Sequence, residues 1–340
     1  MEENSCNKNT DTKVMVSRNI EANIQTFRKT YKDCADIKTR EMYLGAHNDK
    51  KCFMAYIEVA LDMKSFGASG IGMLVKNIEA GISPKDARVA DVTEVKDLNQ
   101  ALDVILVGNV LVFVDGCDYA LKIGDQGYPS LGVKETDSEK VIRGSNEGFS
   151  DSIKINTALV RRRIRSQNLK VKETTAGVRS NTTVDIMYMK DIAYPQVVTE
   201  IMKRLDKYEV DGVLDSGVIE QLAEKKWYSP FPEFQTTQRP DRAAMAVLEG
   251  RVVVLCDNSP IALILPTDFN SFLKTTDDYY NRFEAASFAR IIRYVSAFLA
   301  MTLPGLYLAV TNFHTQILPT SLLLSFWEAR IGCPFPEVVE

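Results

Sequence analysis

The chain has 340 residues, of which 45% are apolar and 25% are charged, and its formal net charge is -4. This composition is ordinary for a globular protein and leaves room for two modest domains plus a further segment, while the acidic balance argues against a nucleic-acid partner. The six cysteines are scattered without a C-x-x-C pair and only two histidines occur, so we expect no metal site, no disulfide framework and no cofactor.

The chain begins with a polar segment that lacks apolar periodicity, which predicts a disordered tail over residues 1–18. The segment also lacks the apolar core of a secretory signal, so the soluble part is expected on the cytoplasmic side. From residue 20 the pattern predicts an α/β domain. Its elements are a helix at 20–31, a strand at 52–61, a helix after 62, a strand at 87–92, a helix at 93–106 and a hairpin with arms at 110–114 and 119–123.

A phrase of this first domain recurs later in the chain. LVGNVLVFVDGCDYALKI (106–123) aligns with LEGRVVVLCDNSPIALIL (248–265), so that Gly108 matches Gly250 and Asp115 matches Asp257. A predicted strand and helix also recur upstream of it, at 183–189 and 194–208. Segments of this kind often use similar residues by chance. The alternative is a true repeat, which predicts two similar α/β subdomains with mixed sheets and helices, at 19–133 and 134–285, and a cleft between them suited to a small ligand.

Arginines are concentrated at 143–165, in RGSNEGFSDSIKINTALVRRRIR. Ser150 can cap a helix whose apolar positions form one face. The four arginines at 161, 162, 163 and 165 cannot all point to water from such a helix, so at least one is expected to meet a buried partner. That partner is either an internal carboxylate, from Glu147, Asp185 or Asp241, or the carboxylate or phosphate of a bound ligand.

A second charged cluster, Arg239-Pro240-Asp241, precedes a predicted helix at 242–248. Pro240 suits a first helical turn and Asp241 favours its positive end, whereas Arg239 has no local role and is expected to pair across the interface between the subdomains. Together the two clusters give the candidates for ligand binding or for ion pairs between the subdomains, which are Arg143, Glu147, Asn156, Arg161, Arg162, Arg239 and Asp241.

The sequence does not indicate an enzyme. The glycines at 67, 70 and 72 follow neither the G-x-G-x-x-G nor the Walker order, so no phosphate loop is expected. No nucleophile elbow occurs, and a Ser/His/Asp site would depend on His47 in a polar loop or on His314 at a membrane edge. We therefore assign no catalytic residue.

A membrane segment is predicted near the end of the chain. No Asp, Glu, Lys or Arg lies between Tyr294 and Trp327, and about 20 apolar residues at 1.5 Å each span the roughly 30 Å hydrocarbon core. We expect 286–340 to start a transmembrane domain, with one span at about 291–312 and a short interfacial or re-entrant helix at about 317–330. A buried core helix is the alternative. The arginines at 282, 290 and 293 precede the apolar run, which favours an N-in orientation.

The candidates for a membrane or gating role in this segment are Pro304, Gly305, His314 and Pro319. Each proline removes a backbone donor, and inside a bilayer the freed carbonyl needs a partner from a neighbouring helix or a water-lined cavity. A packed bundle around a pathway and an ordinary kink both remain open. His314 either anchors the helix among lipid headgroups or lines a pathway.

The ordered motifs of the chain resemble those of the A-subunit (GerA) family of spore germination receptors. The resemblance covers most of the chain from about Asp36 and is strongest from Val141 onwards. It runs through RGSNEGF, LVRRRI, TQRPD, LEGRVVV, DNSPIALILP, DDYYNRFEAASFARIIRY, LPGLYLAVTNFH, ILPTSLLLS and CPFPEVVE. The chain departs at Ser145-Asn146, where the family has Pro-Arg, and at Gln238, where it has Glu. These departures predict an altered ion-pair pattern in the second subdomain.

The resemblance implies a non-enzymatic receptor subunit in the spore inner membrane, with its soluble region on the cytoplasmic (core) side. It implies a transporter-like B subunit and a lipoprotein C subunit as partners, homo-oligomers in contact with membrane lipid, and a nutrient-sensing complex proposed to be a ligand-gated ion channel. An amino acid or a sugar is the nutrient class it implies. The alternative is an assembly or scaffold subunit whose soluble region docks other subunits without binding nutrient. Family members continue beyond the position of Glu340, which implies a truncated product or a fragment.

Overall fold

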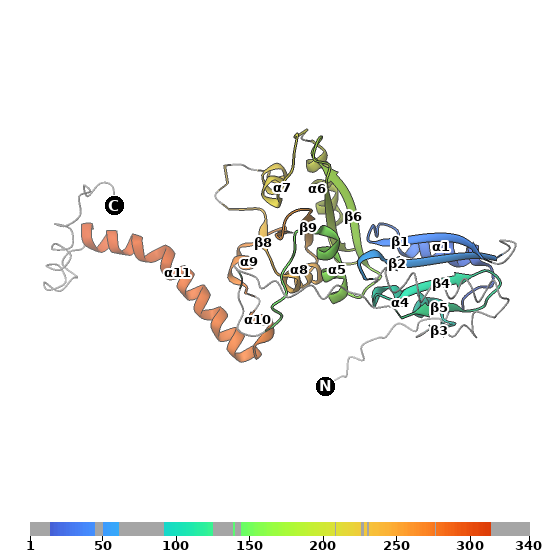
Figure 1. Cartoon of the computed structure of the whole chain (residues 1–340). Helices are drawn as coiled ribbons and strands as arrows, with labels where there is room; N and C mark the ends of the chain where they lie inside the picture. Colours follow the sequence, from blue (N-terminus) through green and yellow to red (C-terminus); the bar gives the residue numbers. More distant parts are fainter. Residues whose placement is uncertain are drawn as a thin grey trace. The chain divides into compact units, whose positions relative to one another are not determined.

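The computed structural model describes residues 14–44, 50–60, 92–124, 139, 144–207, 209–225, 228–229, 231–275 and 277–313. The chain divides into two compact units, Met1–Asp268 and Phe269–Glu340. The first unit contains two sheets, each with its own helices (Figure 1).

The first sheet is antiparallel, with strands in the order β1-β2-β4-β5-β3. Its elements are β1 (Ile37–Leu44), β2 (Lys50–Ile57), the short 3-10 helix η1 (Glu58–Ala60), β3 (Val92–Val95), β4 (Val110–Val114) and β5 (Ala120–Ile123). Helices α1 (Ile20–Thr30) and α4 (Leu98–Leu106) pack on one face, where Ile24 and Phe53 belong to the same core. Side chains alternate along a strand, so Met54 is buried on the opposite face.

The second sheet repeats this order as β6-β7-β9-β10-β8. Its elements are β6 (Leu169–Ala176), β7 (Thr182–Met189), β8 (Gln235–Thr237), β9 (Val252–Cys256) and β10 (Ala262–Leu265). Helices α5 (Ile153–Arg163) and α8 (Pro240–Leu248) cover one face, and α6 (Pro195–Lys207) and α7 (Ser216–Ala223) cover the other. All five strands are therefore held between two layers of helix, which explains why β9 and β10 are apolar throughout.

The predicted fold class, two similar subdomains followed by an apolar helix, is confirmed, but the expectation of mixed sheets is wrong. All pairs between named strands are antiparallel. The reason is that β1-β2, β4-β5, β6-β7 and β9-β10 are each consecutive in the chain and adjacent in a sheet, and two strands joined by a short turn run antiparallel.

The two subdomains share hydrogen bonds as well as topology. The Asn23 side chain accepts from the backbone N–H of Ser17 at 3.0 Å and donates to its carbonyl at 2.7 Å. The Asn156 side chain does the same to Ser150, at 2.8 and 2.6 Å. Each asparagine therefore fixes the chain that leads into its helix, and the candidate Asn156 has a structural role that the first subdomain reproduces.

The helix starts are capped from a distant hairpin. The backbone N–H of Ile153 donates to Asp257 at 3.1 Å, and that of Ile20 donates to Asp115 at 3.4 Å. We expected Ser150 to cap α5, and this is wrong, because the side chain that reaches the first turn comes from the β9-β10 turn. Asp115 and Asp257 are the residues that the sequence repeat had aligned.

Two boundaries differ from the predictions. The helix expected at 93–106 begins at Leu98, because β3 occupies the preceding residues and Asp97 caps the helix by accepting from the N–H of Asn99 at 2.9 Å. Residues 14–18, expected in the polar tail, lie against this region, where the N–H of Val16 donates to the carbonyl of Lys96 at 2.9 Å. The first subdomain therefore includes them.

The second unit contains α9 (Phe269–Leu273), α10 (Asp277–Tyr280) and α11 (Phe283–Phe313). Asp278, whose side chain is 1% exposed, pairs with Arg293 and Arg290 of α11. Arg293 also donates to the carbonyl of Leu273 in α9. These contacts fasten the two short helices to the base of the long one.

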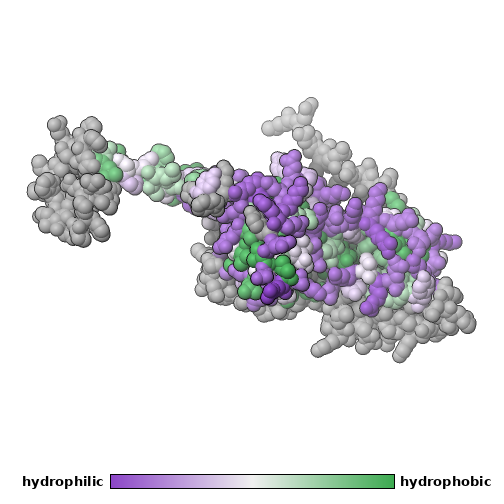
Figure 2. Space-filling view, turned by 90° about the horizontal axis from the view of Figure 1, so that it is seen from above, coloured by the Kyte–Doolittle hydropathy of each residue, from purple (hydrophilic) through white to green (hydrophobic). Residues whose placement is uncertain are grey.

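Within the described ranges, α11 is the helix long and apolar enough to cross a membrane, over Phe283–Val310, with a mean hydropathy of 1.4 and none of its apolar window buried. Hydrophobic side chains lie along it in Figure 2, whereas the visible face of the first unit is largely hydrophilic. The helix begins before the expected span at 291–312, and its N-terminal part carries Arg290 and Arg293, which pair with Asp278. The helix expected at 317–330 lies outside the described residues.

Candidate functional site at the junction of the two subdomains

The junction starts with backbone pairing. Residues 33–35 lie beside the edge strand β6, where Cys34 forms a parallel bridge with Val171. The N–H of Ala35 donates to the carbonyl of Val171, and the N–H of Val171 donates to the carbonyl of Asp33, both at 3.0 Å. The first subdomain thus adds a short strand segment to the edge of the second sheet. This pairing fixes the position of residues 33–35 along β6.

A buried ion pair lies next to this bridge. Arg161 of α5 binds Asp36 with two hydrogen bonds, of 2.8 Å from Nε and 2.9 Å from Nη2, and its Nη1 donates to the carbonyl of Leu169 at 3.0 Å. The side chains of Arg161 and Asp36 are 0% and 7% exposed. Burial acts to lower the pKa of Arg161, but the Asp36 carboxylate outweighs it and the pKa is raised, so the arginine remains a cation.

Lys170 and Cys34 complete this side of the junction. Lys170 donates from Nζ to the carbonyl of Thr30 at 2.7 Å, and its Nζ lies 3.7 Å from Cys34 Sγ. Burial raises the pKa of the Cys34 thiol, so it stays protonated and is a packing residue rather than a nucleophile.

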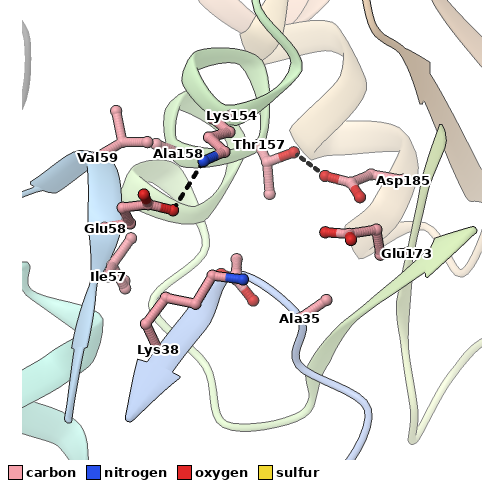
Figure 3. A pocket seen from close by; sticks show the side chains of 11 residues that line it. Ala35, Lys38, Ile57, Glu58, Val59, Lys154, Thr157, Ala158, Glu173 and Asp185 are labelled. Atoms are coloured by element: carbon pink, nitrogen blue, oxygen red, sulfur yellow. Dashed lines mark hydrogen bonds and ion pairs between the residues drawn. The ribbon is translucent and has the colours of Figure 1, made fainter. Parts of the chain in front are cut away.

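A pocket opens on the other side of the ion pair (Figure 3). It encloses about 40 Å³, enough for a few waters or the head group of a small molecule. It is lined by residues of both subdomains, namely Ala35, Asp36, Lys38, Ile57, Glu58, Val59, Lys154, Thr157, Ala158, Glu173 and Asp185. Lys154 and Glu58 reach across it and form an ion pair at 2.9 Å. The predicted cleft thus corresponds to a small pocket with charged walls.

Asp185 lies in the wall of this pocket and is 6% exposed. Its Oδ2 accepts from Thr157 Oγ1 at 2.6 Å, whereas its buried Oδ1 has no hydrogen-bond partner among the described residues. Burial raises the pKa of Asp185 to about 7, against an ordinary value of 3.8. This carboxylate can therefore change its charge near neutral pH.

The other arginines of α5 pair inside the second subdomain. Arg162 and Arg163 both bind Glu147, each at 2.6 Å. Burial acts to raise the pKa of Glu147, but the two guanidinium groups outweigh it and the pKa is lowered. Glu147 was among the expected partners of the arginines, whereas Asp36, the partner of Arg161, was not.

Arg239 was expected to pair across the interface, and the structure places its contacts elsewhere. It binds Asp241 from Nε at 3.1 Å and from Nη2 at 2.6 Å, and it donates to the carbonyls of Glu139 and Ser145 at 3.2 and 2.8 Å. Its role is therefore to hold the segment before α5 against the start of α8. The reason is local, because Asp241 is two residues away and reaches the guanidinium directly.

The remaining candidates lie in or near the membrane segment or outside the described residues. Pro304 and Gly305 are inside α11. Arg143, His314 and Pro319 lie outside the described residues. Within the described ranges no group of three or more His, Cys, Asp or Glu side chains is placed to hold a metal ion.

Of the residues that form the pocket, only Asp185 was expected to take part in a site, as a partner of the arginines, and that pairing is wrong because its carboxylate accepts from Thr157. One signal was available, because Asp185 is the single charged residue in β7, whose sequence is TTVDIMYM and whose other residues are mostly apolar and buried. A carboxylate in such a strand needs a partner or a ligand. For Lys38, Glu58 and Lys154 no sequence signal existed, since each is an ordinary surface charge until the two subdomains meet.

Comparison with known proteins indicates a family for this chain. A family model described as Bacillus/Clostridium GerA spore germination protein matches residues 25–340. The chain is 33% identical to spore germination protein KA of Bacillus subtilis (strain 168), covering 96% of this chain and 61% of that protein. It is 32% identical to spore germination protein B1 of the same strain, covering 96% and 69%. The chain thus spans less than two thirds of the length of spore germination protein KA.

A solved structure supports the same conclusion. The fold is similar to that in the crystal structure of the N-terminal domain of the A subunit of the Bacillus megaterium spore germinant receptor GerK3. The TM-score is 0.58 at 27% sequence identity, and the match covers 76% of this chain and 98% of that one. The chain belongs to the GerA family of spore germination proteins.

Proposed function

We propose that this chain acts in spore germination as the A subunit of a nutrient germinant receptor, in the spore inner membrane and with its soluble region on the cytoplasmic side. Family membership and the apolar helix α11 support the proposal. The observation that carries it is the pocket between two subdomains of like build, because small ligands usually bind between domains. No catalytic constellation is part of the proposal, and the subunit is not an enzyme.

The proposed mechanism is a shift between two packings of the subdomains. On one side of the pocket the Arg161–Asp36 pair is buried, whereas on the other the Lys154–Glu58 pair is 62% and 42% exposed. An exposed pair contributes little, so the pocket opens on that side while the buried side serves as the pivot. A nutrient that fits one packing better shifts the equilibrium toward it.

In the complete receptor this shift acts on the membrane part. The proposed gating residues are Pro304 and Gly305 in α11, together with His314 and Pro319. The proposed partners are a transporter-like B subunit, a lipoprotein C subunit and further copies of this chain, and the proposed output is a ligand-gated ion channel. Because this chain spans 61% of the length of spore germination protein KA, all of these roles concern the receptor as a whole.

Spore germination tests the proposal directly. Spores that lack the gene are expected to lose the response to their nutrient, and Lys154→Ala is expected to raise the nutrient concentration needed for a half-maximal response. Arg165→Ala is the matched control, because Arg165 is an exposed basic residue just beyond α5. An unchanged response in the deletion strain, with other receptors removed, would refute a role in germination.

A scaffold role is the second candidate. It is favoured by large apolar side chains on the surface of the second subdomain, including Tyr194, Leu214 and Phe231 at 73%, 75% and 69% exposure, which suit docking to another protein. Calorimetric titration of the purified chain with amino acids and sugars separates the two roles. Binding heat counts against the scaffold, whereas no heat together with a germination defect in the deletion strain supports it.

A further inference from the structure

The strand register places Asp185 at a position that the first subdomain fills with an apolar side chain. In the first subdomain Glu41 of β1 lies opposite Phe53 of β2, and at the same place in the second subdomain Glu173 of β6 lies opposite Asp185 of β7. All four strands have eight residues. Glu41 and Glu173 are each the fifth residue of their strand, and Phe53 and Asp185 are each the fourth residue of the strand that pairs with it. Phe53 is fully buried in the core of the first subdomain.

Thr157, the hydrogen-bond partner of Asp185, also stands where the first subdomain has an apolar residue. Helices α1 and α5 both have 11 residues, and aligning Asn23 with Asn156 places Thr157 where α1 has Ile24. Ile24 belongs to the apolar core around Phe53. The second subdomain therefore has a hydroxyl and a carboxylate at two positions that the first subdomain fills with apolar side chains. The first subdomain folds with apolar side chains at both positions, so polar side chains are not required there for the fold to form.

The buried carboxylate is also incompletely bonded. Its Oδ2 has the Thr157 hydroxyl, but its Oδ1 is buried without a hydrogen-bond partner among the described residues. An unmet buried acceptor is costly and rare, and is explained when a ligand, a water or an ion completes it. In Figure 3 Asp185 and Glu173 lie side by side at one end of the pocket, from neighbouring strands.

When Asp185 is ionised, the charged groups around the pocket include one more negative charge than positive charges. Asp36 is paired with Arg161 behind the wall, and Glu58 is paired with Lys154. The remaining charged groups in the lining are the carboxylates of Glu173 and Asp185 and the amine of Lys38. Two carboxylates therefore face one lysine. Like charges on opposite residues of adjacent strands repel each other, and a cation between them relieves that repulsion.

We propose that this pocket binds a small molecule through a protonated primary amine, with Asp185 and Glu173 as acceptors and the Thr157 hydroxyl orienting the Asp185 carboxylate. The inference rests on the proposed function and adds the class of ligand. An ammonium group has three N–H donors, so one of them can donate to the unpaired Oδ1 of Asp185. Its positive charge also offsets the excess negative charge of the two carboxylates. A neutral hydroxyl compound supplies a donor but no charge, and a carboxylate supplies neither.

Ligand-observed NMR on the full chain in detergent tests the inference with three probes of similar size, propylammonium, 1-propanol and propionate. Propylammonium is expected to bind at least tenfold more tightly than either of the others. Asp185→Asn keeps the shape and removes the charge, and it is expected to weaken propylammonium binding about 10- to 100-fold. Glu41→Gln is the matched control, because it removes the equivalent of Glu173 from the first sheet and is expected to change nothing.

A second variant guards against a folding defect. Thr157→Val with Asp185→Leu restores an apolar pair like that of the first subdomain, so it is expected to melt no lower than the wild type and to lose propylammonium binding. The affinity of the wild type is also expected to rise between pH 6 and pH 8, as Asp185 ionises in the field of Glu173, Asp36 and Lys38, and this rise is expected to be absent in Asp185→Asn.

Three results would overturn the inference. They are equal propylammonium binding by wild type and Asp185→Asn, tighter binding of propionate or 1-propanol, and no binding of propylammonium at all. The second result leaves the proposed function standing with another ligand class. If propylammonium does not bind at all, the germination phenotype of the deletion strain still tests the proposed function. That phenotype does not depend on any of the three probes.

Discussion

The buried pair of Arg161 and Asp36 gives the sharpest test of how the two subdomains are joined. Arg161→Met removes the cation and leaves the Asp36 carboxylate, 7% exposed, without its partner. Breaking a buried ion pair in this way costs about 3 to 5 kcal/mol of unfolding free energy. For a unit of this size each kcal/mol lowers the melting temperature by about 2 to 4 °C, so a fall of roughly 6 to 20 °C is expected.

The repeat supplies a matched control for this experiment. Arg28 occupies in α1 the position that Arg161 occupies in α5, but it pairs with Glu41 on the surface and its side chain is 66% exposed. Arg28→Met is therefore expected to change the melting temperature little, because exposed pairs are screened by water. The assay is differential scanning calorimetry of residues 14–268, which lie in one compact unit.

A double variant separates the loss of the pair from the loss of the charge. Arg161→Met with Asp36→Leu replaces both partners by apolar side chains and is expected to recover most of the stability, since such replacements are often neutral. The reasoning would be refuted by equal shifts for Arg161→Met and Arg28→Met. A split into two melting transitions in Arg161→Met is also expected, because the pair joins the subdomains.

Three further predictions concern other positions. Gly250→Ala is expected to destabilise the protein more than Gly116→Ala, because both have positive φ, of +87° and +82°, but only at Gly250 does a new Cβ meet Ile192, at 2.8 Å; urea unfolding of the two variants compares them. Asp185 has a raised pKa, so its stabilising effect is complete below its ordinary value of 3.8 and is lost as the pH rises to about 7. The unfolding free energy is thus expected to fall by about 2 to 3 kcal/mol between pH 5 and pH 8 through this group, and Asp185→Asn is expected to lack that fall in pH-dependent urea titrations. Asp278→Asn removes the negative charge that pairs with two arginines at the base of α11 and is expected to speed amide hydrogen exchange in α10, while unchanged exchange there would contradict a stabilising role for these ion pairs.

The sequence predicted the parts of the fold that depend on local pattern. The hairpins and their repeat were predictable, because a glycine with positive φ and an aspartate at the turn recur at Gly108 and Gly250 and at Asp115 and Asp257. The strand β1 was missed. It is an edge strand whose sequence, IKTREMYL, is mostly polar because most of its side chains are exposed, and such a strand has no apolar run to detect.

The site was less predictable, because it depends on contacts between distant segments. The helix geometry predicted that one arginine of α5 has a buried partner. It did not predict which residue that partner is, because Asp36 lies 125 residues away and several acidic residues were available. Glu147 and Asp241 were nominated because they lie near arginines in the chain, and both are indeed bonded to them. The pocket required Lys38 and Glu58 to meet Thr157 and Asp185, and only the docking of two subdomains brings them together.

The short bridge at Val171 has a consequence for the solubility of the parts. Strand β6 is the outer strand of its sheet, and an uncovered outer strand offers free N–H and carbonyl groups to any other chain. Residues 33–35 occupy some of those groups by pairing with Val171. The first subdomain thus covers part of this edge of the second sheet. The second subdomain produced alone would expose the unpaired backbone groups of β6 and would be prone to aggregation. The first subdomain precedes it in the chain, so it can fold first during synthesis and then cover this edge.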